Sequence, residues 1–149
     1  MTVTLASPQA VDQPEWIRLY RGYADYYGVP MTEQTLDTVW DWIQQPDMAF
    51  YCRLAKSEEG RAIGLMHYRA MPSPLRGTYI GFLDDLYVDP AHRGSGAVDT
   101  MLETLREEAR SHGWPFVRWI TREQNYRGRA VYDRHATHTD WQTYQLDTQ

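Results

Sequence analysis

The sequence holds very little cysteine and no long hydrophobic run. Its single cysteine, Cys52, excludes an internal disulfide, and the apolar residues around it are typical of a buried structural thiol. No apolar stretch approaches the roughly 20 residues of a membrane-spanning helix. The first residues, 1–11, lack the basic segment and apolar core of a signal peptide. These absences predict a cytoplasmic protein that does not enter a membrane.

Positive charge is also scarce. The 149 residues include 15 Lys and Arg against 20 Asp and Glu, which gives a formal net charge of −5. Nucleic-acid-binding domains usually carry a dense basic patch, and this sequence has none, so no nucleic-acid partner is expected. An acidic protein suits a cationic small molecule. His135 and His138 have no cluster of further ligands beside them, so no metal is expected.

The chain reads as one mixed α/β domain over residues 1–149, because no repeat, linker or low-complexity block interrupts it. Helical and alternating spacings predict ten elements in order. These are a strand at 2–6, helices at 14–27 and 33–45, strands at 48–55, 62–71 and 78–88, a helix at 97–112, a strand at 116–121, a helix at 126–136 and a closing strand at 140–146. Such an order is typical of a sheet flanked by helices.

Two glycines lie in the loop "DPAHRGSGAV" (89–98), between a predicted strand and a predicted helix. Such loops usually hold an anion, because the backbone comes close and the first N–H groups of the helix point at it. A Walker A loop needs a lysine, and a dinucleotide fingerprint needs a third glycine where Asp99 stands. The remaining pattern, Arg/Gln-x-x-Gly-x-Gly/Ala, is read as Arg93, Gly96 and Val98. An ordinary Asp-Pro turn that caps a surface helix is the alternative.

This loop resembles the acyl-CoA pyrophosphate loop of the GNAT N-acetyltransferase superfamily, and the order of elements is similar to the GNAT fold along nearly the whole chain. The resemblance implies an α/β fold whose mixed, mostly antiparallel sheet is splayed at the acetyl-CoA site and flanked by helices. It also implies acetyl-CoA as the acetyl donor and, from relatives, a homodimer. Val98 departs from the pattern, which has Gly or Ala there.

Two segments look like the spermidine/spermine N-acetyltransferase branch, which includes thialysine acetyltransferases. That branch has Leu-Glu-Asp before the loop, where this chain has Leu83, Asp84 and Asp85. It also has an Asn followed seven residues later by a Tyr, here Asn125 and Tyr132. The Gly that follows this Tyr in the branch is replaced by Ala136.

The resemblance also assigns cofactor-binding residues. The N–H groups of the loop would bind the pyrophosphate, the end of the preceding strand would pair with pantetheine, and Asn125 would bond the pantetheine arm or the adjoining backbone. A simple loop cap is the alternative for Asn125. The expected cofactor-binding residues are Leu86, Tyr87, Val88, Arg93, Gly94, Ser95, Gly96, Ala97, Val98 and Asn125.

Acetyl transfer from a thioester to an amine needs a group that protonates the departing thiolate. Tyr132 is the expected catalytic acid, because a phenol has a reference pKa of ~10 against ~8.5 for a thiol. It therefore stays protonated at neutral pH and still has a proton to donate. With eleven tyrosines in the chain, a purely structural core tyrosine is the alternative.

Asp84 and Asp85 interrupt an otherwise apolar strand. Neighbouring strand residues point to opposite faces, so one of the two would face the core unless a bulge intervenes. The resemblance places Asp84 where the branch has a base-like glutamate, so Asp84 is expected to be catalytic and to handle the acceptor. Asp85 is expected to attract the second ammonium of a diamine. The alternative is that one of them caps the loop or pairs with Arg93.

The sequence therefore predicts an acetyl-CoA-dependent N-acetyltransferase whose acceptor is a primary amine on a small cationic molecule, such as a polyamine, a diamine or a lysine-like amino acid. An antibiotic- or protein-directed acetyltransferase is a second enzymatic hypothesis. A non-catalytic acyl-CoA-binding module is a third, which the presence of Tyr132 disfavours.

Overall fold

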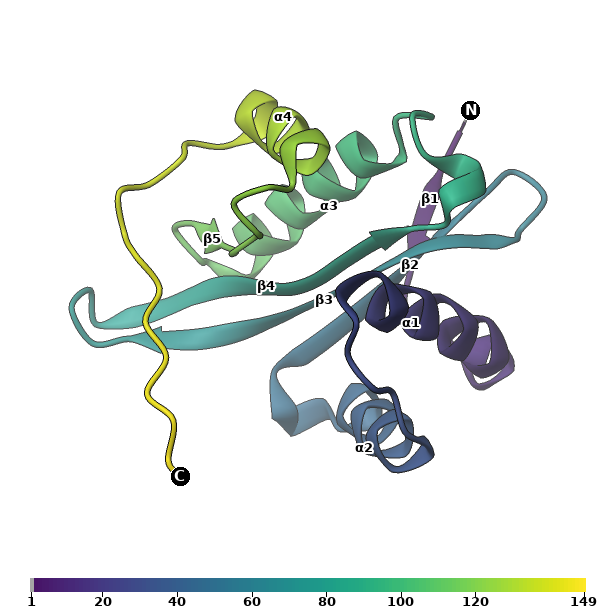
Figure 1. Cartoon of the computed structure of the whole chain (residues 1–149), viewed down its shortest axis with the longest axis horizontal. Coiled ribbons are helices and arrows are strands. Elements are labelled where there is room, and N and C mark those ends of the chain that lie inside the picture. Colours follow the sequence, from purple (N-terminus) through teal and green to yellow (C-terminus); the bar gives the residue numbers. More distant parts are fainter. Residues whose placement is uncertain (1) are drawn as a thin grey trace.

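The computed structural model describes residues 2–149 and shows a central sheet with helices on both faces (Figure 1). The strands are β1 (Thr4–Ala6), β2 (Phe50–Lys56), β3 (Ala62–Ser73), β4 (Thr78–Val88) and β5 (Val117–Arg118). The helices are α1 (Gln13–Tyr27), α2 (Glu33–Gln44), α3 (Ala97–His112) and α4 (Tyr126–His135). Short 3-10 turns occupy η1 (Ala10–Asp12), η2 (Pro46–Met48) and η3 (Pro90–His92). Helices α1 and α2 cover one face, and α3 and α4 cover the other.

The helix ends follow local signals in the sequence. Gly28 ends α1 with a φ of 67° and Gly113 ends α3 with a φ of 76°, conformations that glycine adopts without strain. The hydroxyl of Thr32 accepts a hydrogen bond of 3.1 Å from the Thr35 amide and caps α2. The predicted helix 97–112 is confirmed over its whole length.

The sheet is open, and its spatial order follows the chain, β1-β2-β3-β4-β5. Three neighbouring pairs are antiparallel. The last pair, β4 with β5, is parallel and very short, with Gly81 opposite Val117 and Phe82 opposite Arg118. In the described part of the chain, β4 therefore has no strand partner on its β5 side beyond Phe82. This confirms the mixed, mostly antiparallel sheet.

A β-bulge on β4 resolves the expected conflict between the two aspartates. His67 lies opposite Asp85, and Tyr68 lies opposite Leu83, so Asp84 is the extra residue. The bulge places both carboxylates on the α1 face of the sheet, where Asp85 contacts His67 and Asp84 contacts Arg69.

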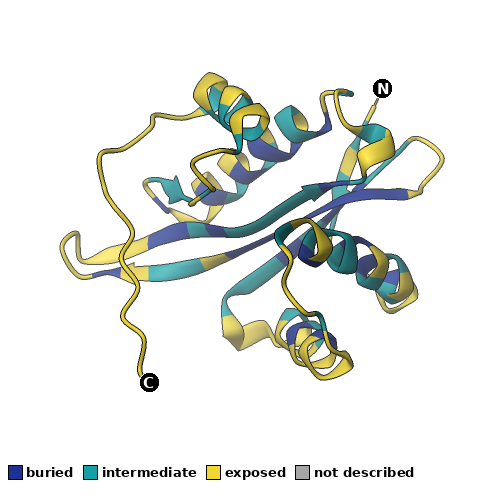
Figure 2. Ribbon diagram, in the orientation of Figure 1, coloured by how far each residue is buried: buried dark blue, intermediate teal, exposed yellow. Residues whose placement is uncertain are grey.

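Two apolar clusters hold the helices to the sheet, and the buried residues follow the central strands (Figure 2). The α1 cluster consists of Trp16, Leu19, Leu36, Val39, Cys52, Leu54, Ala62 and Leu65. The α3 cluster consists of Ala55, Ile63, Met66, Tyr68, Leu83, Val88, Ala97, Met101, Leu102, Leu105, Ala109 and Trp114. Adjacent strand residues such as Leu54 and Ala55 thus serve opposite faces. Cys52 is only 1% exposed, as the sequence predicted for a structural thiol.

The predicted closing strand, 140–146, is wrong. Residues 136–149 run outside the sheet and are exposed throughout (Figure 2). The predicted strand 116–121 also shrinks to Val117–Arg118. Alternating residues favour a strand only where a neighbouring strand supplies hydrogen-bond partners, and the two-residue β5 offers almost none.

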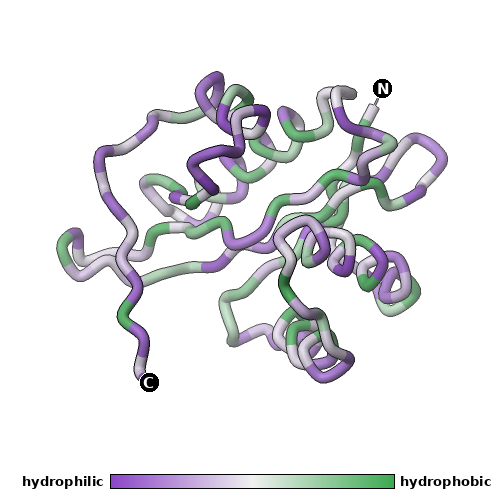
Figure 3. The backbone as a smooth tube through the Cα atoms, viewed as in Figure 1, coloured by the Kyte–Doolittle hydropathy of each residue, from purple (hydrophilic) through white to green (hydrophobic). Residues whose placement is uncertain are grey.

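Hydropathy varies along the chain as the fold requires (Figure 3). Hydrophobic residues lie along β3 and β4, and the turn between β2 and β3 is hydrophilic. Within residues 2–149, no helix combines the length and apolar character that crossing a membrane requires.

Candidate functional site

A cavity of about 330 Å³ lies among the end of β4, the glycine loop, α1, α4 and the start of α3. Of the residues singled out in the sequence, those lining it are Leu86, Tyr87, Val88, Arg93, Gly94, Gly96, Ala97, Val98, Asn125 and Tyr132. Ser95, Asp84 and Asp85 are not among its lining residues. The two aspartates directly precede Leu86, the first residue of β4 to line the cavity.

The two glycines of the loop present backbone to the cavity. Gly94 and Gly96 have φ values of 79° and 85°, which other residues adopt only with strain. Gly96 is the N-cap of α3, and no side chain caps that helix end. Ser95 faces away and donates a 2.6 Å hydrogen bond to the His92 carbonyl. The uncapped N–H groups of α3 are therefore free to bind an anion.

Arg93 is held at the edge of the cavity. Its Nε donates to the Val88 carbonyl at 3.2 Å, and its guanidinium lies over the rings of Tyr26 and Tyr87 at 5.6 and 5.7 Å. Arg93 forms no ion pair with Asp84 or Asp85, which contact Arg69 and His67 instead. The alternative role considered for these aspartates, a salt bridge to Arg93, is therefore not observed. Asp89, instead, caps the turn by accepting from the Ala91 amide.

Tyr132 lines the cavity from α4. Its ring packs edge-on against Trp119, with centroids 5.4 Å apart. Burial raises the pKa of Tyr132 to about 12, and Tyr27 and Tyr26 add to the effect. The phenol therefore keeps its proton throughout the neutral range and is a donor to any group placed in the cavity.

Asn125 caps α4 and also lines the cavity. Its side-chain oxygen accepts from the Gly128 amide at 3.3 Å, and its Nδ2 donates to the Thr121 hydroxyl at 2.9 Å. The structure thus shows the loop-capping role that the sequence left open, with the side chain at the cavity wall.

Asp84 and Asp85 lie in contrasting environments. Asp84 receives bonds of 3.2 and 2.9 Å from Arg69 Nε, yet burial raises the pKa of its carboxyl. Burial also acts to raise the pKa of Asp85. There, hydrogen bonds from His67 and Tyr20, at 2.8 and 2.9 Å, outweigh burial and hold that pKa below its usual range. Protonation is therefore easier for Asp84 than for an ordinary carboxyl, whereas Asp85 stays ionised.

Sequence reasoning missed His67, the residue that contacts Asp85. It is fully buried, with its Nε2 3.0 Å from the indole nitrogen of Trp16. The available signal was a histidine in the middle of the apolar strand "GLMHY" (64–68), since a buried polar side chain needs partners. Those partners are distant in sequence and only the fold identifies them.

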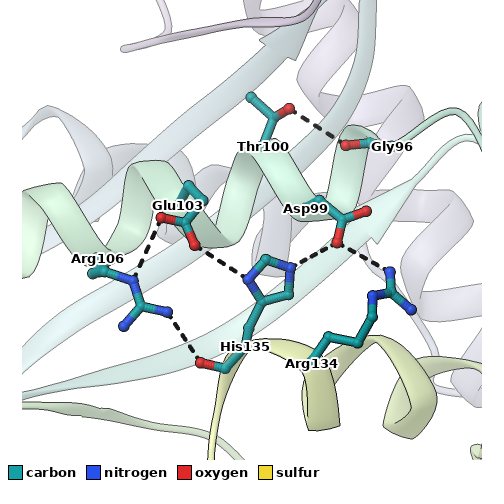
Figure 4. A network of polar contacts seen from close by, with 7 residues as sticks. All are labelled: Gly96, Asp99, Thr100, Glu103, Arg106, Arg134 and His135. Carbon is teal, nitrogen blue, oxygen red and sulfur yellow. Dashed lines mark hydrogen bonds and ion pairs between the residues drawn. The ribbon is translucent and has the colours of Figure 1, made fainter.

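Helix α4 is tied to α3 by a polar network (Figure 4). The ring of His135 lies between two carboxylates, with Nε2 2.6 Å from Asp99 and Nδ1 3.2 Å from Glu103. Arg134 reaches the same Asp99 oxygen at 3.0 Å, and Arg106 donates to the His135 carbonyl at 3.0 Å. His135 and then Arg134 hold the pKa of Asp99 below its usual range.

This network positions the cavity wall. α4 has no buried residue, and partly buried Val131 and Tyr132 pack it on the α3 cluster. The polar network and this packing together hold Tyr132 at the cavity. Across residues 2–149, no group of three His, Cys, Asp or Glu side chains is arranged to hold a metal ion.

The arrangement of an uncapped helix start, a glycine loop and a splayed strand agrees with a known family. Residues 16–136 match the model of the Acetyltransferase (GNAT) family. The chain belongs to this family. It is 27% identical over 130 residues, 87% of this chain and 81% of the other, to D-amino-acid N-acetyltransferase HPA3 of Saccharomyces cerevisiae.

Solved structures of other proteins share the fold. A ribosomal-protein-alanine N-acetyltransferase from Brucella melitensis biovar Abortus 2308 superposes with a TM-score of 0.81 at 24% identity, over 98% of this chain and 99% of that one. AAC(6')-Iy, in complex with the bisubstrate analogue CoA-S-monomethyl-acetylneamine, gives a TM-score of 0.85 at 14% identity, over 100% and 99% of the two chains. The family match, and not these likenesses of fold, makes the protein an N-acetyltransferase of the GNAT type.

GNAT acetyltransferases use acetyl-CoA, and the cavity residues fit this donor. The N–H groups at the start of α3 suit the pyrophosphate, and Arg93 and Arg127 line the same cavity with positive charge, while Arg134 is paired with Asp99 there. β4 has no strand partner on its β5 side at Leu86 and Val88, so its backbone groups there, apart from the Val88 carbonyl that Arg93 occupies, suit the pantetheine amides.

Asp99→Asn should lower the melting temperature by about 2 °C at pH 7, because it weakens the contacts of α4 with α3. The folded pKa of Asp99 lies below its unfolded value of ~3.9. The stabilisation is therefore present above that pH and disappears as the pH falls through the folded pKa. Thermal melts from pH 3 to 7 should show the two proteins converging at the acidic end. Asp37→Asn, on the exposed side of α2, is the control. A difference in melting temperature between wild type and Asp99→Asn that stays constant down to pH 3 would contradict a stabilising role for the ionised Asp99 carboxylate.

Gly96→Ala should weaken CoA binding about tenfold, since binding must restore a φ of 85° that alanine resists by roughly 1–2 kcal/mol. Gly113→Ala is the matched control, because Gly113 has a φ of 76° at the other end of α3. Both sites have open space for a methyl group, so strain is the shared effect. Calorimetry should show reduced CoA affinity for the first variant alone. Equal affinities would exclude the loop as the phosphate site.

Proposed function

We propose that this N-acetyltransferase acts on a primary amine of a small cationic acceptor, such as a polyamine, a diamine or a lysine-like amino acid. The observation that carries the proposal is the pair Asp84 and Asp85, whose pKa values are displaced in opposite directions. Paired groups displaced in this way can take different proton-transfer roles. The resemblance to the spermidine/spermine branch supports the same acceptor class.

The position of the pair along β4 supports this role. The pyrophosphate loop follows Val88, so moving back along β4 leads away from the phosphates at roughly 3.3 Å per residue. A pantetheine arm alongside residues 86–88 therefore brings its thioester toward Asp84 and Asp85. An acceptor amine must meet the thioester at that end of the cavity.

The two carboxylates take separate roles. Asp85 remains ionised and attracts an ammonium group. Asp84, with its raised pKa, accepts the proton that the reacting nitrogen loses, directly or through a water molecule. The nitrogen lone pair then bonds to the thioester carbon, and the carbon–sulfur bond breaks. Tyr132 donates its phenol proton to the thiolate that leaves.

Arg69 favours a second candidate, an amino-acid acceptor. Its guanidinium is 44% exposed and lies on the same sheet face as both aspartates. A guanidinium binds a carboxylate in two-pronged fashion, so the site could hold the ammonium and the carboxylate of one small zwitterion. The yeast relative is named a D-amino-acid N-acetyltransferase.

A panel of amines tests the acceptor class through CoA thiol release. Spermidine, 1,4-diaminobutane and lysine should be acetylated, and aniline, which is neutral at pH 7, should be a poor acceptor. Asp85→Asn should raise KM for the cationic amines about tenfold by removing a charge-assisted contact, with CoA affinity unchanged. Asp37→Asn is the control. Activity confined to neutral arylamines would overturn the proposal, and activity confined to α-amino acids would select the second candidate.

Tyr132→Phe should lower kcat by roughly 10²–10⁴-fold, the usual contribution of a general acid. The ring and its packing on Trp119 remain, so CoA affinity should change little. The loss should be smaller with an acyl donor whose leaving thiol is more acidic. Tyr126→Phe is a suitable control, because Tyr126 is 72% exposed on the same helix. A near-normal kcat with chemistry rate-limiting would make Tyr132 a structural residue.

We also propose a homodimer, in which residues 136–149 pack on a second copy of the chain. This segment exposes Trp141, Tyr144 and Leu146, the last two to 92%, and its alternating pattern suits pairing with a sheet edge. Light scattering should give a dimer mass. Leu146→Asp should shift it toward a monomer, whereas Gln145→Asp should not. A monomeric wild-type protein at micromolar concentration would contradict this arrangement.

A further inference from the structure

We propose that Trp16 sets the charge preference for the acceptor: it holds His67 in the neutral form, so that Asp85 keeps a negative charge that no protein cation balances. The inference rests on the proposed acceptor site at Asp85. It makes Trp16, which lies in the core and touches no cavity atom named above, a specificity-determining residue that acts through His67.

The hydrogen bonds fix the tautomer of His67. An indole N–H can only donate, and that of Trp16 points at His67 Nε2 from 3.0 Å. Nε2 must therefore be the unprotonated, accepting nitrogen. The proton lies on Nδ1, which donates to Asp85 Oδ2 at 2.8 Å. Trp16 and His67 are both 0% exposed, so water does not compete for these bonds.

The ionisable surroundings of His67 favour a charged ring. Burial lowers the pKa of His67, while Cys52 and Asp85 raise it, to about 9. The indole opposes this outcome. If Nε2 of His67 were protonated, its N–H would point at the N–H of the Trp16 indole, with the two nitrogens 3.0 Å apart. Neither donor would then have an acceptor, in a site that excludes water. The Trp16 contact therefore keeps the imidazole neutral at pH 7.

The state of His67 decides the net charge near the acceptor. The other ionisable groups that interact with Asp85 are Tyr20, Tyr23, Tyr27 and Asp84, and Cys52 adjoins His67. Burial, together with Asp85, raises the pKa of both Tyr20 and Tyr23, so these phenols stay neutral. Asp84 and Arg69 form their own ion pair.

With a neutral His67, the charge on Asp85 has no counter-ion, and an acceptor ammonium supplies it. With a charged His67, Asp85 would already be paired, and the attraction for a cation would be lost. A buried carboxylate that lacks a cation is costly. Here the hydrogen bonds from His67 and Tyr20 keep it ionised without neutralising it.

The protonation state is tested first, independently of activity. Nitrogen-15 spectra of histidine-labelled protein distinguish an Nδ1–H imidazole from an imidazolium, and the His67 signals are assigned by their loss in His67→Gln. We expect the wild-type ring to be neutral, with its proton on Nδ1, from pH 6 to 8. Trp16→Phe should convert it to the imidazolium at pH 7. An imidazolium in the wild-type protein at pH 7 would overturn the inference.

Acceptor kinetics provide the second test, with 1,4-diaminobutane as the cationic probe and aniline as the neutral one. Trp16→Phe should raise KM for the diamine about tenfold and leave KM for aniline within twofold. Trp40→Phe is the matched control, because Trp40 packs on Trp16 with ring centroids 5.1 Å apart and is not a hydrogen-bond partner of His67 among the described residues. Equal changes for both probes, or for both variants, would reduce Trp16 to a packing role.

A double variant separates protonation from packing. Glutamine at position 67 keeps an N–H for Asp85 and an oxygen for the indole, but it cannot become charged. Trp16→Phe added to His67→Gln should therefore leave KM for the diamine unchanged relative to His67→Gln alone. A further tenfold rise in the double variant would refute the charge mechanism. If the wild-type protein acetylates neither probe, the proposed acceptor class fails, while the spectra still decide the state of His67.

Discussion

The structure depends on one incomplete strand pairing. β4 keeps its β3 neighbour along its length, but its pairing with β5 ends at Phe82. The backbone groups beyond that point need other partners, because buried N–H and C=O groups are rarely left unpaired. The cavity, the glycine loop and α4 all lie on this side. A closed sheet would leave no place for an extended acyl donor.

The bulge at Asp84 adds a second constraint at the same position. In a regular strand, one carboxylate would point into the α3 cluster, which is apolar. The extra residue turns both toward the α1 face, where Arg69 and His67 meet them. The irregularity that shifts the register of β3 and β4 therefore gathers the charged groups beside the cavity.

Local features were predictable from the sequence, and long-range ones were not. Thr32, Gly28 and Gly113 act on neighbouring residues, so their caps could be read directly. The contact of Trp16 with His67 joins residues 51 apart, and no spacing rule reports it. The prediction of a strand at 140–146 was wrong for a related reason. A strand forms only where a neighbouring strand supplies hydrogen-bond partners, and the alternation of residues within one segment does not show whether such a neighbour exists.

The match between spatial order and chain order in the sheet has a consequence for folding. No strand has to enter between two that are already paired, so the sheet can grow outward from the β2–β3–β4 meander. Short loops close with little entropic cost, and such local pairings form early. The glycine loop, β5 and α4 follow β4 in the chain and are added to an existing edge. A ribosome-bound chain can therefore pair β2, β3 and β4 before the glycine loop and α4, which complete the cavity, emerge.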